Sequence, residues 1–281
     1  MKTRILVASE SDPNEAVIRE AAQALADGAL VVFPTETVYG VGARATSRSA
    51  LESLHQLKVR PADKPFTLHL AEVEDAERFA GRLPAIGERL IRKTWPGPLA
   101  LVVPDRRGPT AKQEELIEEY IYKDGTVGLR CPSHRVGRAI LRAAGVPVAA
   151  SSANLAGHPP PQQASEAVAE LDGHVALIVD AGRTPYARPS TVVQVWEDGS
   201  YKVLREGAIT SHRVQRLART RILLVCTANV CRSPMAVGLA KQMMAKRFGC
   251  EPEELEARGI EVHSCGTAAS ADLEASPNAV S

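Results

Sequence analysis

The stretch ALVVFPTETVYGVG, residues 29–42, decides the fold. Its first five residues form a short apolar run that Pro34 ends, which is typical of a buried β-strand. The run is followed at once by a cluster of polar side chains: Thr35, Glu36, Thr37 and Tyr39. Because ligands of open α/β sheets bind beyond the carboxyl ends of the strands, we expect this polar segment to border a binding site. Gly40 and Gly42 then allow the backbone to approach a ligand closely.

The chain on both sides of this stretch alternates helical and strand-like patterns. Upstream, Asp12-Pro13 and NEAVIREAAQALADG predict a capped helix with Pro13 in its first turn and Gly28 at its end. Helical spacing recurs at residues 48–58, 72–80, 84–94, 135–145 and 165–173. Apolar strands are predicted at 66–70, 98–104, 126–130, 147–150 and 176–180, with a strand pair at 190–195 and 201–206. This alternation predicts an α/β fold with an open, twisted, mixed sheet.

One charged segment, residues 104–125, interrupts the alternation. We interpret it as a solvated loop or surface helix; a mobile element near a ligand is the alternative that the residues leave open.

Composition narrows the function classes. The 281 residues include 34 Lys and Arg against 33 Asp and Glu, so bulk charge favours neither nucleic acid nor a membrane as partner. No apolar run approaches the roughly 18 residues of a membrane span. The cysteines are odd in number and form no CxxC pair, which favours a reducing cytoplasm over a disulfide scaffold or a zinc site. They are Cys131, Cys226, Cys231, Cys250 and Cys265.

A second polar cluster, SSAN at residues 151–154, follows the strand predicted at 147–150. Cations accompany the two clusters. Lys58 and Arg60 close a helix, Lys64 and His69 come soon after, and Arg130 and Arg205 each end a predicted strand. Many hydroxyl donors, several positive charges and no evident nucleophile indicate an anion site. Such a site suits phosphoryl or nucleotidyl transfer, in which positioning and charge neutralisation do most of the catalysis.

The motifs PTETVYGVG, KVRPADKPFTLHL, SSANLAG, RPSTVV and LREG occur in the order typical of YrdC-like threonylcarbamoyl-AMP synthases. The resemblance covers roughly residues 14–210. It implies that L-threonine, bicarbonate and ATP give threonylcarbamoyl-AMP and pyrophosphate in the cytoplasm, with Mg²⁺ offsetting charge. It also implies that a partner complex transfers the threonylcarbamoyl group to tRNA. The extra carboxy-terminal domain of the longer synthases is absent, so the chain resembles the short bacterial type.

The resemblance assigns roles to particular residues. It implies that threonine is held by Thr35, His69, Arg130 and Ser190. It implies that ATP is held by Lys58, Arg60, Lys64, Thr126, Ser152, Asn154 and Arg205. Of these, Lys58 and Arg60 are the candidate catalytic residues, because they would offset charge on the departing pyrophosphate. Lys64 and Ser151 depart from the Asn and Pro that many members carry, although both changes keep a polar or small residue.

A second domain is predicted to begin after a basic linker at residues 211–220. A strand, RILLVC, leads into the loop CTANVCRS and then into a helix. Backbone N–H groups of such a loop can surround a phosphate at a helix N-terminus. The same field lowers the pKa of Cys226, while Arg232 can clamp phosphate oxygens and Ser233 can donate to the thiolate. Asn229 and Cys231 complete the candidate phosphate loop.

The run VCTANVCRSP resembles the low-molecular-weight protein-tyrosine phosphatases, and HSCGTAA resembles that family's next strand and turn. Ala228 replaces a glycine usual in the loop, so we expect backbone strain there. The chain stops before the family's acidic residue, and Asp272 lies too near the second strand to replace it. We therefore predict a synthase-like domain at 1–210, a linker at 211–220 and an incomplete phosphatase-like domain at 221–281, with oxyanion binding rather than turnover at Cys226.

Two other functions stay open from the residues alone. The chain could act as a phosphotyrosine hydrolase with the large domain as a passenger. It could also be a double-stranded RNA-binding module without catalysis, for which the near-zero net charge gives little support.

Overall fold

The computed structural model describes residues 2–11, 13–59, 64–108, 116–256, 258–269, 274–276 and 279. The chain divides into two compact units, Met1–Val214 and Gln215–Ser281. Each unit is described by itself.

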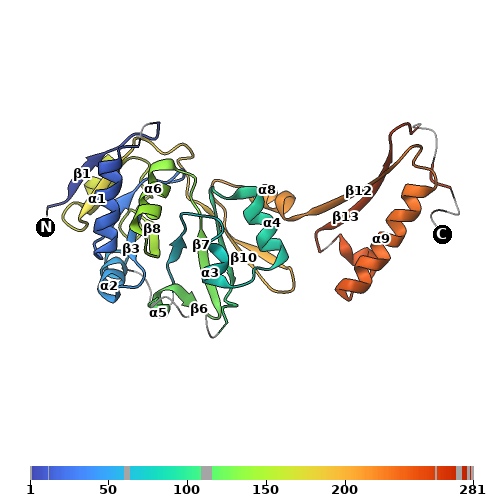
Figure 1. The fold of residues 1–281 in the computed structure, drawn as a ribbon, viewed down its shortest axis with the longest axis horizontal. Helices are drawn as coiled ribbons and strands as arrows, with labels where there is room; N and C mark the ends of the chain where they lie inside the picture. The colour runs from blue at the N-terminus through green and yellow to red at the C-terminus, as the bar shows by residue number, and fades with distance from the viewer. Residues whose placement is uncertain are drawn as a thin grey trace. The chain divides into compact units, whose positions relative to one another are not determined.

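The first unit is built on one large sheet (Figure 1). Its strands are β1 Arg4–Val7, β2 Val31–Phe33, β3 Gly40–Arg44, β4 Thr67–His69, β5 Leu99–Pro104, β6 Tyr122–Lys123, β7 Thr126–Arg130, β8 Val148–Ser152, β9 Leu177–Asp180, β10 Thr191–Val195 and β11 Tyr201–Arg205. The strand order is β1-β9-β2-β3-β8-β4-β7-β5-β10-β11, and β6 pairs with β7 beside this path.

The sheet is mixed, as the alternation and the late strand pair predict. The pairs β1/β9, β2/β9, β4/β7 and β5/β10 are parallel. The pairs β2/β3, β3/β8, β4/β8, β5/β7 and β10/β11 are antiparallel. In this order β4 lies between β8 and β7, although β4 precedes both of them in the sequence by more than 50 residues.

Helices flank the sheet and supply its core (Figure 1). They are α1 Glu15–Ala26, α2 Arg48–Leu57, α3 Ala76–Ala80, α4 Ala85–Thr94, α5 Glu118–Ile121, α6 Arg135–Ala144, α7 Ala164–Leu171 and α8 Ser211–Ala218, the last of which crosses the boundary between the units. The main apolar cluster joins α1 and α6 to the strands beneath them, through buried residues such as Leu25, Phe33, Ile140 and Val179. Burial of these side chains fixes α6, and with it the segment that begins the helix.

The N-terminal cap of α1 differs from the prediction. Asn14 caps the helix, because its Oδ1 accepts hydrogen bonds from the amides of Ala16 at 2.9 Å and Val17 at 3.4 Å. Pro13 therefore precedes the helix instead of lying in its first turn, and Asp12 lies outside the described residues. The predicted stop is confirmed: α1 ends at Ala26 and Gly28 adopts a left-handed φ of 87°.

Residues 40–44 form strand β3, where the sequence predicts that Gly40 and Gly42 let the backbone approach a ligand. Gly40 does border the cavity described below, but Gly42 serves packing. A Cβ added at Gly42 would lie 2.8 Å from the ring of Phe33, closer than van der Waals contact allows. Glycine is needed here because the aromatic ring of the neighbouring strand occupies the space.

The charged segment at 104–125 is described only in part. Residues 109–115 lie outside the described residues. Beyond them the short helix α5 leads into β6, and Arg107 lies over the ring of Tyr122 with its guanidinium carbon 3.8 Å from the ring centre. This cation–π contact ties the segment to the strand it precedes.

The second unit contains two parallel strands, β12 Thr220–Cys226 and β13 Ile260–Gly266, with helix α9 Arg232–Phe248 between them in sequence. A 3₁₀ turn at Pro252–Leu255 follows α9. The unit leaves large apolar side chains exposed, including Leu223 on β12 and Leu239 and Met243 on α9. Within the described part of the chain, no helix combines the length and apolarity needed to cross a bilayer.

Candidate functional site

A cavity of about 760 Å³ opens on the first unit, at the ends of β2, β4, β7 and β8 and over β5 and β10. Its volume lies in the range of small-molecule sites. The polar and charged residues that border it include Thr35, Lys64, His69, Lys123, Thr126, Arg130, Ser151, Ser152, Ser190, Glu197 and Arg205. Side chains separated by 170 positions in the sequence, from Thr35 to Arg205, therefore border one space.

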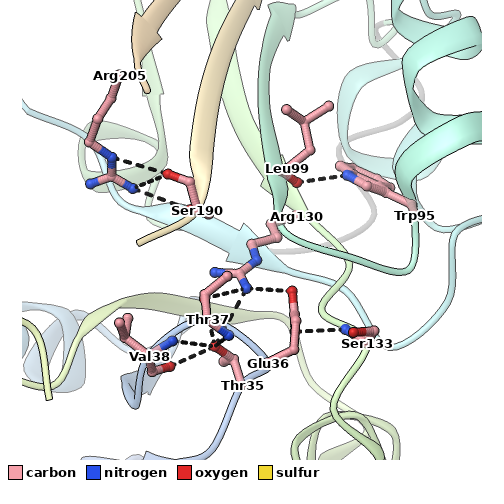
Figure 2. Close-up of polar contacts among 10 residues, drawn as sticks. All are labelled: Thr35, Glu36, Thr37, Val38, Trp95, Leu99, Arg130, Ser133, Ser190 and Arg205. Carbon is pink, nitrogen blue, oxygen red and sulfur yellow. Dashed lines mark hydrogen bonds and ion pairs between the residues drawn. The ribbon is translucent and has the colours of Figure 1, made fainter. Parts of the chain in front are cut away.

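Arg130 lies at the centre of the most buried part of this site (Figure 2). Its Nη2 donates to Glu36 Oε1 at 2.7 Å, to Thr37 Oγ1 at 2.7 Å and to Thr35 Oγ1 at 3.4 Å. Its buried Nε has no hydrogen-bond partner among the described residues. Arg130 thus keeps donor capacity beside the cavity, as a carboxylate-binding arginine requires.

His69 reaches the cavity from β4 as a neutral imidazole. Burial first, and then the nearby charge of Arg130, lower its pKa from 6.5 to about 3. Its Nδ1 lies 3.2 Å from the carbonyl oxygen of Thr67. A carbonyl can only accept, so Nδ1 carries the hydrogen and Nε2 is left as an acceptor.

Arg205 and Ser190 form a second polar group at the cavity (Figure 2). The guanidinium of Arg205 donates to the Ser190 carbonyl at 2.9 Å and to its hydroxyl at 3.2 Å through Nη2. Burial lowers the pKa of Arg205, and repulsion from Arg130 acts in the same direction. Four cationic side chains border the cavity, against the two acidic side chains Asp124 and Glu197, and this balance favours an anionic ligand. The four are Lys64, Lys123, Arg130 and Arg205.

Lys58 is held by the segment after β8. Its Nζ donates to the Ser152 carbonyl at 2.9 Å, to the Asn154 carbonyl and to Asn154 Oδ1 at 3.2 Å. Asn154 also donates from Nδ2 to the carbonyls of Leu155 and His158, each at 2.7 Å. Lys58 and Asn154 thus meet each other beside Ser152, which borders the cavity, although neither of the two borders it directly.

The remaining ATP-binding candidates differ in whether the structure places them at the cavity. Lys64 and Thr126 border the cavity. Arg60 lies outside the described residues, so its predicted role stays a prediction.

Sequence reasoning missed Glu36 as a functional residue. It lies inside the quoted PTETVYGVG motif, where it was counted only as part of a polar cluster. A carboxylate between two threonines directly after a buried strand was the available signal, since an acid in that position needs a cation as partner.

Two of the phosphate-loop candidates of the second unit, Asn229 and Ser233, contact Cys226. Its Sγ lies 3.0 Å from Ser233 Oγ and accepts from the amide of Asn229 at 3.2 Å. These hydrogen bonds, the one from Ser233 first, lower the pKa of Cys226 from 9.0 to about 7. Arg232 lies exposed at the first position of α9, and Cys231 is exposed beside it. The strain expected at Ala228 is not found there; the left-handed residue is Asn229, with φ 56°.

Metal-binding side chains do not gather in the described residues. No group of three or more His, Cys, Asp or Glu that could hold a metal ion occurs among them.

Comparison with known proteins gives the family. Residues 23–207 match the Sua5/YciO/YrdC family, which is described as telomere recombination. The chain belongs to the Sua5/YciO/YrdC family. Residues 221–281 separately match the low molecular weight phosphotyrosine protein phosphatase family, in agreement with the predicted fusion.

Several relatives of this chain are named threonylcarbamoyl-AMP synthase. The threonylcarbamoyl-AMP synthase of Bacillus subtilis is 36% identical over 218 residues, which cover 76% of this chain and 61% of that protein. The putative threonylcarbamoyl-AMP synthase of Mycobacterium tuberculosis is 39% identical over 197 residues, which cover 70% of this chain and 87% of that protein. The chain spans about three fifths of the Bacillus subtilis relative's length.

A solved structure supports the fold. Sua5 of Pyrococcus abyssi complexed with L-threonine superposes with a TM-score of 0.70 and 24% identity, covering 93% of this chain and 92% of that one. At this identity the likeness establishes the shared fold.

Proposed function

We propose that the first unit is an L-threonylcarbamoyladenylate synthase, which makes threonylcarbamoyl-AMP and pyrophosphate from L-threonine, bicarbonate and ATP. The observation that carries the proposal is the single cavity bordered by Thr35, His69, Arg130, Ser190 and Arg205. The names of the relatives and the threonine bound by the Pyrococcus abyssi protein support it.

In this proposal the threonine end of the cavity is the buried group around Arg130. The guanidinium binds the amino-acid carboxylate with its remaining donors, and the neutral His69 accepts a hydrogen bond from the threonine hydroxyl at Nε2. Ser190 borders the same cavity, and both of its oxygens accept hydrogen bonds from Arg205.

The reaction then needs two steps, formation of a carbamate and its transfer to the α-phosphorus of ATP. The threonine amine attacks the carbon of bicarbonate, and water leaves, so that a carbamate forms. A carbamate oxygen attacks the α-phosphorus of ATP in line with the departing pyrophosphate. Arg205 and Lys64 border the cavity where the triphosphate would lie and would offset its charge. Magnesium enters as the counter-ion of ATP and would neutralise charge on its phosphates.

The test is threonine-dependent release of pyrophosphate by the whole chain, with the anhydride product identified by mass spectrometry. We expect Arg130→Lys to raise the KM for L-threonine by at least about tenfold, because lysine cannot reproduce a bidentate carboxylate contact. The matched control is Arg142→Lys, an arginine on α6 that pairs with Glu72 and does not border the cavity. Absence of any threonine-dependent pyrophosphate from the wild-type chain refutes the proposal.

The biological product would be a modified tRNA. We propose that threonylcarbamoyl-AMP passes to a partner complex that transfers the threonylcarbamoyl group to an adenosine next to the anticodon. Adding that complex and tRNA to the assay should consume the anhydride and label the tRNA. Salt-sensitive tRNA binding by a chain that makes no anhydride would instead favour the RNA-binding alternative.

We also propose that the Cys226 loop of the second unit binds a phosphate-like oxyanion. The lowered pKa of Cys226 and the loop amide of Asn229 turned toward its sulfur favour this function. Inorganic phosphate should slow alkylation of Cys226 by iodoacetamide in a concentration-dependent way. An alkylation rate that is indifferent to phosphate would remove the proposal, and p-nitrophenyl phosphate turnover lost in Cys226→Ser would replace it with catalysis.

A further inference from the structure

The Glu36 carboxylate is almost fully buried, at 3% exposure, where three segments of the first unit meet. Its Oε1 accepts from Arg130 Nη2 on β7 at 2.7 Å, and its Oε2 accepts from the amide of Ser133 at 2.8 Å (Figure 2). Ser133 stands just before His134, which caps α6. The carboxylate therefore joins the loop after β2 to a strand and to the start of a helix.

Glu36 is kept ionised by its partners. Burial alone would raise its pKa, but the charge and hydrogen bond of Arg130 together with the Ser133 amide hold the pKa below 4.5. A buried carboxylate is tolerated only when its charge is paired and its oxygens are bonded. Both conditions are met here, because Oε1 of Glu36 is bonded to Arg130 and Oε2 is bonded to the amide of Ser133.

The contacts of Arg130 are unequally divided over its guanidinium. A single nitrogen, Nη2, donates hydrogen bonds to the side chains of Glu36, Thr37 and Thr35, which all lie in the loop after β2. The buried Nε has no partner among the described residues. One end of the guanidinium is therefore fixed by three acceptors of one loop, while Arg130 also borders the cavity.

We propose that Glu36 is a positioning residue for the amino-acid substrate: it fixes one end of the Arg130 guanidinium so that the other donors are held ready for the substrate carboxylate. The inference rests on the proposed function and deepens it. Because fixed donors lose less freedom on binding, Glu36 acts on affinity for L-threonine more than on the chemical step.

A second effect follows from charge. Burial and then repulsion from Arg130 lower the pKa of Arg205. Glu36 cancels the charge of Arg130, so two arginines can border one cavity before a ligand arrives.

The experiment compares the full chain with its Glu36→Gln variant by calorimetric titration of L-threonine and by steady-state kinetics. Glutamine preserves the size and the bond to Ser133 but removes the charge. We expect the Kd and the KM for L-threonine to rise about tenfold, with kcat and the KM for ATP changed less than about threefold. The matched control is Glu72→Gln, which breaks an acid–arginine contact with Arg138 away from the large cavity and should leave threonine affinity unchanged.

A double-mutant cycle separates positioning from general stabilisation. In an Arg130→Met background, adding Glu36→Gln should change threonine affinity by less than about twofold, because the group that Glu36 positions is already absent. If Glu36→Gln alone does not fold, Glu36→Asp replaces it, because aspartate keeps the charge and withdraws the carboxylate from Arg130 by one methylene. Unchanged threonine affinity in a folded Glu36→Asp variant would also overturn the role of Glu36.

Three outcomes are distinguishable. A wild-type chain that neither binds L-threonine nor forms the anhydride defeats the proposed function itself. A functional wild type with a folded Glu36→Gln variant of equal threonine affinity overturns the role of Glu36. A further loss caused by Glu36→Gln in the Arg130→Met background also overturns it, because the carboxylate would then act independently of Arg130.

Discussion

The neutral state of His69 makes the first unit acid-sensitive in a way that can be calculated. Its pKa is about 3 in the folded chain, against 6.5 for the unperturbed side chain. Between these values the unfolded chain binds a proton that the folded chain does not. The folded-state pKa is depressed, so the contribution of His69 is complete above pH 6.5 and is lost as the pH falls toward 3.

The magnitude follows from proton linkage. Each pH unit inside this window costs about 1.4 kcal/mol of the free energy of unfolding. Lowering the pH from 7 to 4.5 should therefore remove about 2.5 kcal/mol through His69 alone. Glu36 and Asp105 titrate lower, because arginine partners hold the pKa of both carboxylates below their usual values.

The assay is urea unfolding at pH 7 and pH 4.5, followed by tryptophan fluorescence. The chain has two tryptophans, Trp95 and Trp196, and both lie in the first unit, so the signal reports that unit. The perturbation is His69→Gln, which keeps a polar side chain but cannot titrate. The wild type should lose about 2.5 kcal/mol more than this variant between the two pH values. His212→Gln, a change of an exposed histidine, is the control and should behave as the wild type.

Equal pH dependence in the wild type and in His69→Gln would refute the reasoning. It would mean that the imidazole gains a proton in the folded unit, so that its Nε2 is a donor rather than an acceptor.

Four further predictions rest on other contacts. Lys58→Ala should abolish threonylcarbamoyl-AMP formation while circular dichroism shows a retained fold, because the ammonium that holds the segment after β8 is lost; near-normal pyrophosphate release would contradict this. Gly137→Ala places a Cβ 2.2 Å from the carbonyl oxygen of Pro34 and should cost about 1–3 kcal/mol of stability. Gly87→Ala, whose Cβ meets only ordinary contacts beyond 3.5 Å, should be neutral or stabilising in the same denaturation assay. Alkylation of Cys226 should follow a thiolate titration with a midpoint near pH 7, measured by peptide mass spectrometry.

Local patterns predicted most elements of the first unit, because apolar periodicity reflects which face of a segment is buried. They failed at β3, where Gly40 and Gly42 lower strand propensity and only the ring of Phe33 explains the second glycine. The cap of α1 was placed too early because both Asp12 and Asn14 are good capping residues, and sequence alone does not choose between them.

The sequence predicts which residues belong to the candidate site, but not which of their side chains contact one another. Arg130 was recognised because it ends a strand, yet its partner Glu36 depends on how the loop after β2 meets the start of α6. Lys58 was interpreted as a phosphate ligand or as a cation at a helix end. In the structure it contacts Ser152 and Asn154, which lie almost a hundred residues away in the sequence. Contacts of this kind follow from sheet order, which local patterns do not encode.

The two proposed anion sites of this chain are assembled differently, and this difference determines how much of each site a sequence alone can predict. In the second unit, the segment from Cys226 to Ser233 supplies both the cysteine sulfur and its hydrogen bonds, so one strand–loop–helix segment contains the proposed site. In the first unit the charges come from separate strands and need a buried counter-charge to coexist. A dispersed site of this kind is sensitive to any change that moves one strand against another. We therefore expect substitutions in the core between α6 and β2 to weaken threonine binding, whereas the Cys226 loop should respond mainly to changes within its own segment.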